Sequence, residues 1–275
     1  MKTQTKQTLK SIMAAGALAL ATLVPSSTKA QSVYCGFKGP TEYQVDNRTS
    51  YNLKEVQNGT KTETLADNLI LKYWTGTNNG VFAFANVPYK AVKVGEIDKK
   101  GLGDVFAGIG PRFERKVGDG KLGVLSYAGI TLPTGDEDCK PALGTGRKYD
   151  VKAGLSGTLL SKSGKSELDF SADYTLTKGG DISDEINAGI TVGGRINDNW
   201  RFVVGPMFNY KSGGENDGDS SLTGRLNARY TPSDESGKPT KKMHFEIWAD
   251  KFMQGCGKSC PKENYTATLV FRRNF

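Results

Sequence analysis

The sequence contains a single histidine, His244, and only four cysteines among its 275 residues. One imidazole argues against a histidine-ligated zinc site and against a Ser-His-Asp hydrolase. No apolar run approaches the roughly 18–20 residues of a membrane-spanning helix, which excludes a polytopic helical membrane protein. Glycine is abundant instead, with 34 residues, well above the usual share of about 7%. This composition favours turns and closely packed strands over helices.

Residues 1–30 have the pattern of an export signal. A start with three lysines precedes the apolar stretch 12–24, and small residues, Thr28 and Ala30, then occupy the positions expected before a cleavage site. We therefore expect 1–30 to be a cleaved signal peptide and the mature chain to begin at Gln31. The alternative is an uncleaved anchor.

This segment accounts for half of the apparent basicity. The whole chain has a formal net charge of +8, from 37 basic and 29 acidic residues. Four lysines and no acids lie in residues 1–30, so the rest has 33 basic residues against 29 acids, a net charge of +4. A nucleic-acid partner is not expected, because such binding needs a clustered basic face.

All four cysteines follow the export signal, so they are expected in an oxidising compartment. Cys256 and Cys260 are close enough to form a disulfide within one loop, and Cys35 with Cys139 would complete the pairing. The sequence does not fix this connectivity. A site built from all four thiolates is the alternative, and their wide spacing argues against it. We expect no metal and no cofactor.

Most of the chain alternates between apolar and polar residues with the period of a β-strand. Between Tyr149 and Leu160, for example, apolar residues recur at every second position. The pattern predicts twelve strands, although ten or fourteen are also compatible with it. The expected spans are 51–57, 65–75, 80–93, 103–116, 121–133, 147–161, 166–178, 185–196, 199–211, 221–231, 242–253 and 264–275.

These strands have the length needed to cross a bilayer at a tilt, about 9–11 residues. Short links alternate with longer polar ones, as in outer-membrane barrels with periplasmic turns and external loops. A soluble β-sandwich is the alternative, but aromatic residues at the strand ends favour the membrane barrel. We predict an all-β, antiparallel up-and-down barrel over 51–275, in contact with outer-membrane lipids of a Gram-negative bacterium. Residues 31–50 would form a separate N-terminal segment, periplasmic or lumenal.

The C-terminal segment 264–275 (NYTATLVFRRNF) ends in phenylalanine and is apolar at alternate positions before it. A last strand of this kind resembles the signal by which outer-membrane barrels are recognised. The resemblance implies that the barrel-assembly machinery is a partner, through the strand ending at Phe275. Arg273, third from the end, departs from the pattern.

Three glycine-rich motifs occur in order: Gly101–Asp104, Leu132–Asp136 and Gly144–Gly146, the last followed by the strand from Tyr149. This order resembles the outer-membrane proteins of the meta-pathway phenol-degradation, transporter-like family, over roughly residues 50–275. The resemblance implies uptake of aromatic or other hydrophobic compounds. The cysteine-bearing loops depart from the family.

If the apolar rows face lipid, the polar rows face the lumen. Charged residues on the inward rows fall into an acidic group from the middle strands and a basic group from later ones. Two outcomes are open. Opposed arcs of charge would create a transverse field for solutes, or the charges would pair across the lumen and plug it. The lumen-facing candidates are Asp150, Glu167, Asp169, Asp173, Glu185, Arg195, Arg201, Arg225, Arg229 and Arg272.

We predict passive transport of small solutes, with hydrophobic or aromatic compounds as the finer expectation. The alternatives are a non-transporting structural or surface-interaction barrel and an outer-membrane lipase-type enzyme. An enzyme would have to use His244, which shares the inward row with Glu246. An inward histidine beside acids is more often a satisfied polar residue than a catalyst, so we expect no catalytic residues.

Overall fold

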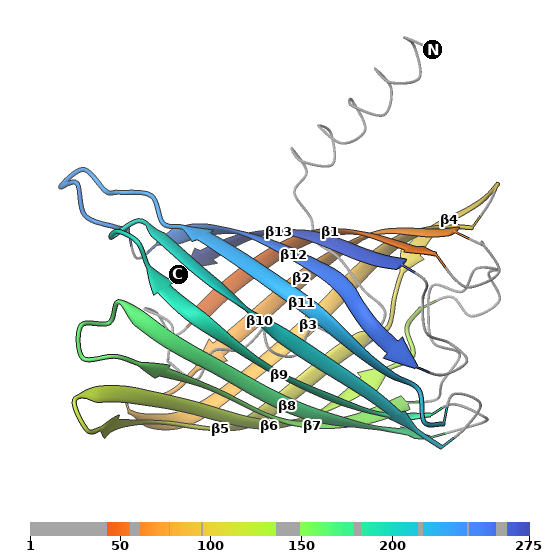
Figure 1. Cartoon of the computed structure of the whole chain (residues 1–275), viewed down its shortest axis with the longest axis horizontal. Coiled ribbons are helices and arrows are strands. Elements are labelled where there is room, and N and C mark those ends of the chain that lie inside the picture. The colour runs from red at the N-terminus through yellow and green to blue at the C-terminus, as the bar shows by residue number, and fades with distance from the viewer. Residues whose placement is uncertain are drawn as a thin grey trace, which may run out of the picture.

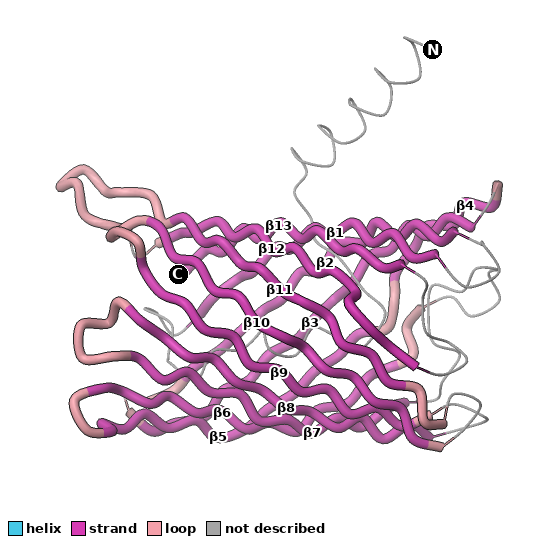
Figure 2. Tube along the Cα trace, in the orientation of Figure 1, coloured by secondary structure: helices cyan, strands magenta, loops and turns pink. Residues whose placement is uncertain are grey.

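The structure is a computed structural model. It describes residues 43–55, 61–76, 78–94, 96–135, 149–178, 183–213, 217–240, 242–256 and 263–275. Figures 1 and 2 show a tilted antiparallel sheet that closes on itself as a barrel. Among the described residues, no helix is long and apolar enough to cross a membrane. The expected signal peptide and Cys35, Cys139 and Cys260 lie outside the described residues, as does the side chain of Cys256. Their disulfides therefore stay a prediction.

The described ranges contain thirteen strands. Neighbours in sequence pair along most of the wall, and β1 closes it by pairing with both β2 and β13. The strands are β1 (Tyr43–Glu55), β2 (Lys61–Trp74), β3 (Asn79–Val94), β4 (Ile97–Leu102), β5 (Val105–Val117), β6 (Gly120–Leu132), β7 (Tyr149–Leu160), β8 (Ser166–Lys178), β9 (Asp184–Arg195), β10 (Trp200–Ser212), β11 (Ser220–Tyr230), β12 (Met243–Cys256) and β13 (Glu263–Asn274).

Two of these strands share one position in the wall. The far half of β3, from Tyr89 to Val94, pairs with β4, whereas its first half pairs with β5. β4 and β5 thus follow one another along β3, separated at Gly103 and Asp104. The result is a closed barrel of twelve strand positions, which confirms the predicted fold and number. The expected single strand 103–116 therefore corresponds to β5, and β4 occupies the rest of the same position in the wall.

The predicted position of the first strand is wrong. β1 begins at Tyr43, so residues 43–50 belong to the barrel wall and not to a separate segment 31–50. The outward row of β1 includes Asn47 and Thr49, which weakens the apolar alternation that marks the later strands. Pairing on both sides, with β13 and β2, holds this strand in the wall despite its polar sequence.

The two faces of the wall differ as a membrane barrel requires. Large apolar side chains on the outward rows are exposed, among them Leu155, Ile190 and Leu269. The neighbouring inward positions, such as Ser156, Thr191 and Thr268, are polar and buried. This alternation around a closed sheet is that of a barrel with a lipid-facing outer belt, and it places the protein in an outer membrane.

Short turns gather at one end of the barrel, where the C-terminus also lies (Figure 1). Gly118 and Gly164 adopt positive φ angles of 57° and 65°, which tight turns between strands require and other residues resist. The longer link 231–242 folds back on itself through a bridge between Ser233 and Pro239. Within it, hydrogen bonding from Ser236 lowers the pKa of Asp234.

Two of the glycine-rich motifs meet at the opposite rim of the barrel. The Thr134 hydroxyl donates to the Gly103 carbonyl at 2.8 Å, and the Gly135 N–H donates to the Asp104 carboxylate at 3.0 Å. The Val105 N–H donates to the Thr134 hydroxyl at 3.0 Å. These bonds tie the start of β5 to the end of β6, where the wall is interrupted. Gly144–Gly146 lies outside the described residues.

The C-terminus takes part in closing the barrel. The Phe275 N–H donates to the Tyr43 carbonyl at 3.1 Å, next to the β1–β13 pairing. The Phe275 side chain is exposed, and the Arg273 guanidinium lies 4.8 Å from its ring. Arg273 therefore departs from the apolar row but packs on the terminal aromatic ring. Recognition of this strand by the assembly machinery stays a prediction.

A lysine introduced on the outer belt should destabilise the barrel according to its depth. Ile190 lies outward at mid-strand in β9, whereas Val117 lies outward at the turn end of β5. Ile190→Lys should lower the free energy of unfolding from lipid vesicles by about 2–4 kcal/mol, and Val117→Lys by about 0–1 kcal/mol. Denaturant titration of vesicle-bound protein measures both. Equal losses would contradict the placement of the lipid belt.

Candidate functional site

The barrel interior brings most of the predicted lumen-facing residues onto one buried surface. Five of them, Asp150, Asp173, Glu185, Arg225 and Arg272, are buried on the rows opposite the exposed apolar side chains. The side chains of four more are half-buried on the same rows: Glu167, Asp169, Arg201 and Arg229. Arg195 occupies one of the alternate positions of β9 that face inward, but it is exposed because it is the last residue of the strand.

Asp46 connects three strands on the inner face of the barrel, and it was not among the residues predicted from the sequence. Its carboxylate accepts hydrogen bonds from Arg272 of β13 at 2.5 and 2.8 Å, Lys72 of β2 at 2.6 Å and Arg48 of its own strand at 2.8 Å. Asp46 is 0% exposed. Because β1 is flanked by β13 and β2, this single carboxylate crosslinks the strands at which the barrel closes.

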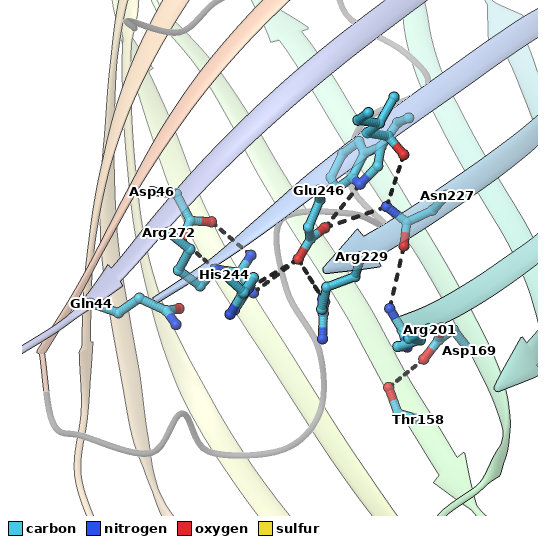
Figure 3. Close-up of polar contacts among 12 residues, drawn as sticks. Gln44, Asp46, Thr158, Asp169, Arg201, Asn227, Arg229, His244, Glu246 and Arg272 are labelled. Carbon is cyan, nitrogen blue, oxygen red and sulfur yellow. Dashed lines mark hydrogen bonds and ion pairs between the residues drawn. The ribbon is translucent and has the colours of Figure 1, made fainter. Parts of the chain in front are cut away.

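A second carboxylate, Glu246 of β12, collects donors from three strands (Figure 3). It accepts from Arg229 Nε at 2.8 Å and from Trp248 Nε1 at 2.9 Å, and it lies 3.4 Å from Arg272 Nη1. The His244 Nε2 atom lies 3.1 Å from the same carboxylate. Arg272 thus links the Asp46 and Glu246 groups into one polar network. His244 is a member of this network, in the role of a satisfied polar residue.

The network continues along the wall through arginine–carboxylate pairs. Arg225 of β11 holds Asp250 of β12 in a two-pronged contact, at 2.6 and 2.7 Å. The Trp248 ring faces the guanidinium of Arg225 at 5.5 Å and that of Arg48 at 4.9 Å. Cations over an indole face are attracted to it. Trp248 therefore connects this pair to the group around Asp46.

Farther round the barrel, Arg201 of β10 forms ion pairs with Glu167 and, at 3.0 Å, with Asp169, both on β8. It reaches across β9 at Gly193, the register partner of Glu167, where no side chain stands in the way. The Lys152 ammonium pairs with Asp173 at 2.9 Å. Among the described residues, these contacts join neighbouring or next-neighbouring strands.

The expected separation of acids and bases into opposed arcs is wrong. Asp46, Glu246 and Asp250 sit among the arginines of the later strands, and Arg201 reaches back to the acids of β8. Asp46 meets Arg272 because β1 and β13, far apart in sequence, are neighbours in a closed barrel, whereas Arg225–Asp250 and Arg229–Glu246 join strands that are adjacent in sequence. These pairs run along the wall and not across the lumen, so a lumen filled by paired charges stays a prediction.

The opposite part of the inner wall is aromatic. Trp74 of β2 contacts Phe82 of β3 with ring centroids 4.3 Å apart, and Phe84 contacts Phe106 at 5.3 Å and Tyr127 edge-on at 5.6 Å. We call this surface the aromatic arc; its members are Trp74, Phe82, Phe84, Phe106, Leu125 and Tyr127. The signal for it in the sequence was the stretch 81–89 (VFAFANVPY), which is apolar on both faces.

Two polar atoms on the inward rows of β2 and β3 lack partners. The Trp74 Nε1 donor and the Asn86 Oδ1 acceptor are buried, with no hydrogen-bond partner among the described residues. Near Trp74, the Arg112 guanidinium lies 6.0 Å from the indole ring and forms an ion pair with Glu114. Buried polar atoms usually have a partner. The aromatic arc is therefore a close-packed cluster whose members other than Phe106 are at most 5% exposed, with one buried donor and one buried acceptor at its edge.

No His, Cys, Asp or Glu group of three or more within the described ranges is placed to hold a metal ion.

Comparison with known proteins shows that this chain has the same fold as solved outer-membrane barrels. No model of a protein family matches the chain, and no curated protein matches it. A crystal structure of an outer membrane channel from Pseudomonas putida F1 is similar, with a TM-score of 0.69 and 15% sequence identity, covering 92% of this chain and 100% of that one. The NanC porin is similar over 84% of this chain and 100% of its own, with a TM-score of 0.52 and 11% identity. These structures share the barrel fold.

Loss of the Asp46 carboxylate should weaken the barrel strongly. Asp46→Asn leaves buried cations, including Lys72 and Arg272, without their shared counter-ion, so the free energy of unfolding should fall by about 3–5 kcal/mol. The matched control is Asp119→Asn in a turn, where the pair with Lys162 is largely exposed and removal should change stability by at most ~1 kcal/mol. Denaturant titration in lipid vesicles compares them. Similar small losses would show that Asp46 does not secure the closure.

Proposed function

We propose that this barrel is a passive outer-membrane channel for small solutes that combine an apolar or aromatic portion with a hydrogen-bonding group. The observation that carries the proposal is the aromatic arc on the inner wall. The interior of a transmembrane barrel is ordinarily polar, so clustered rings there need a reason. These rings are at most 5% exposed apart from Phe106, so a solute would contact them as the side chains packed around them move aside.

The chemistry of the arc supports this class of solute. Rings of Phe84 and Tyr127 meet edge to face, the arrangement that also suits an incoming aromatic ring. The Trp74 indole N–H could donate to a hydroxyl or carbonyl oxygen, and the Asn86 carbonyl could accept from a hydroxyl. A solute with one ring and one hydroxyl would use both surfaces at once.

Two similarities to other proteins also support the proposal. The chain shares its fold with an outer membrane channel. The motifs Gly101–Asp104 and Leu132–Asp136 resemble those of the phenol-degradation, transporter-like family, and residues of both meet at the rim of the barrel. The resemblance implies aromatic or hydrophobic solutes, which agrees with the arc.

The first experiment is single-channel conductance of the refolded protein in a planar bilayer, with a heat-dependent gel shift as the test of folding. Steady ohmic steps are expected from an open aqueous path. Silence from a correctly folded barrel would contradict the proposed passive channel, and would favour a structural or surface-interaction barrel.

Aromatic solutes should interrupt this current more often than sugars of similar size. An aromatic alcohol and a pentose, each added to one side, make the comparison at equal concentration. Replacing Phe84 by Ala should weaken the aromatic blockade by about two- to tenfold, as expected for loss of one ring contact, and should leave the pentose unchanged.

The matched control for Phe84→Ala is Phe208→Ala, which removes an exposed ring from the outer face of β10. It should leave both blockades as in the unaltered protein. Equal effects of the two variants, or equal blockade by both solutes in the unaltered barrel, would refute a role of the aromatic arc in solute passage.

A further inference from the structure

The outer face of the barrel carries a groove of about 470 Å³ across strands β11, β12 and β13. Small residues create it: Gly224, Ala249 and Ala267 stand where most of the outer belt has larger apolar side chains. The register places Ala249 beside Ala267, and Gly224 beside Lys251. Leu226 and Tyr51 contribute to the walls of the groove. An elongated apolar group therefore has room here against the outer belt.

One end of the groove has a positive charge. Lys251 points outward between Gly224 and Tyr265, its register partners on either side. Its ammonium lies 5.6 Å from the Tyr265 ring, and its side chain is exposed. A lysine on the lipid-facing side of a barrel is destabilising unless it lies near the interface or finds a partner. Tyrosine rings mark that interface.

The groove faces the outer leaflet. Tyr51 lies near the end of β1, and Tyr265 near the start of β13, both at the end of the barrel opposite the short turns. Short turns are periplasmic in outer-membrane barrels, so this end is external. Lys251 therefore lies toward the level of the outer headgroups, with Gly224 beside it and with Ala249 and Ala267 extending below it into the hydrocarbon.

We propose that this groove binds one phosphorylated glycolipid of the outer leaflet, with the chemistry of lipid A. A phosphate accepts a charge-assisted hydrogen bond from Lys251, and one acyl chain lies over Gly224, Ala249 and Ala267. The charge fits the anionic headgroup, and the apolar floor fits the chain. This leaflet is where such glycolipids are concentrated, so the site commits to them over glycerophospholipids.

The test counts lipid retained by the purified barrel in native mass spectrometry. Diphosphorylated lipid A, its dephosphorylated form and phosphatidylglycerol are each added at equal concentration. The barrel should retain diphosphorylated lipid A most tightly. Lys251→Gln should weaken that retention about tenfold, the loss expected for one charge-assisted hydrogen bond, and Ala249→Phe should weaken it by filling the groove.

Matched controls separate the site from general effects. Lys162→Gln removes an exposed lysine in a periplasmic-side turn, and Ala228→Phe adds a ring to β11 outside the groove. Both should retain lipid A as the unaltered barrel does, and a heat-dependent gel shift verifies folding of all four variants. The proposal is overturned if Lys251→Gln and Lys162→Gln behave alike. It is also overturned if dephosphorylated lipid A or phosphatidylglycerol is retained as well as the diphosphorylated form.

Discussion

Hydrocarbon offers no hydrogen-bond partners, so every backbone group inside the lipid belt must be satisfied within the sheet. A sheet meets this condition only by closing, and here β1 closes it against β13 and β2. The side chains reinforce the same closure. Asp46 lies inside the wall at β1 and binds Arg272 of β13 and Lys72 of β2. Arg272 also reaches Glu246, so the groups around Asp46 and Glu246 share this arginine.

Closure also explains which parts of the fold the sequence could predict. Strands such as β7 and β8 show clear alternation because each has an apolar face against lipid and a polar face inside. β1 lacks this signal, since Asn47 and Thr49 lie outward, and its position is set by two partner strands rather than by its own pattern. The interruption at Gly103 and Asp104 likewise depends on contacts with Thr134 and Gly135, which no local pattern reveals.

The interior was harder to predict than the wall. The alternation of positions along each strand was enough to assign residues such as Asp173 and Arg225 to the inner face. It could not show which of these side chains contact one another. Asp46 and Arg272 are 226 positions apart in sequence and bonded in the structure. The aromatic arc was hidden for a different reason. In β3 both faces are apolar, so alternation gives no indication that Phe82 and Phe84 point inward.

The paired charges and the aromatic arc act differently on a solute, and together they narrow the class that the proposed channel would favour. A charged solute gains a counter-ion from Asp46, Glu246 or Arg225 only by disrupting an existing buried pair, and breaking such a pair costs about 3–5 kcal/mol. A neutral aromatic solute needs no counter-ion, so it gains contacts with aromatic rings without breaking an ion pair. Trp74 Nε1 and Asn86 Oδ1 are buried and have no hydrogen-bond partner among the described residues, so a solute that reached them would supply one. If the proposed channel is correct, we therefore expect it to favour neutral solutes with a ring and a hydroxyl over ions of either sign.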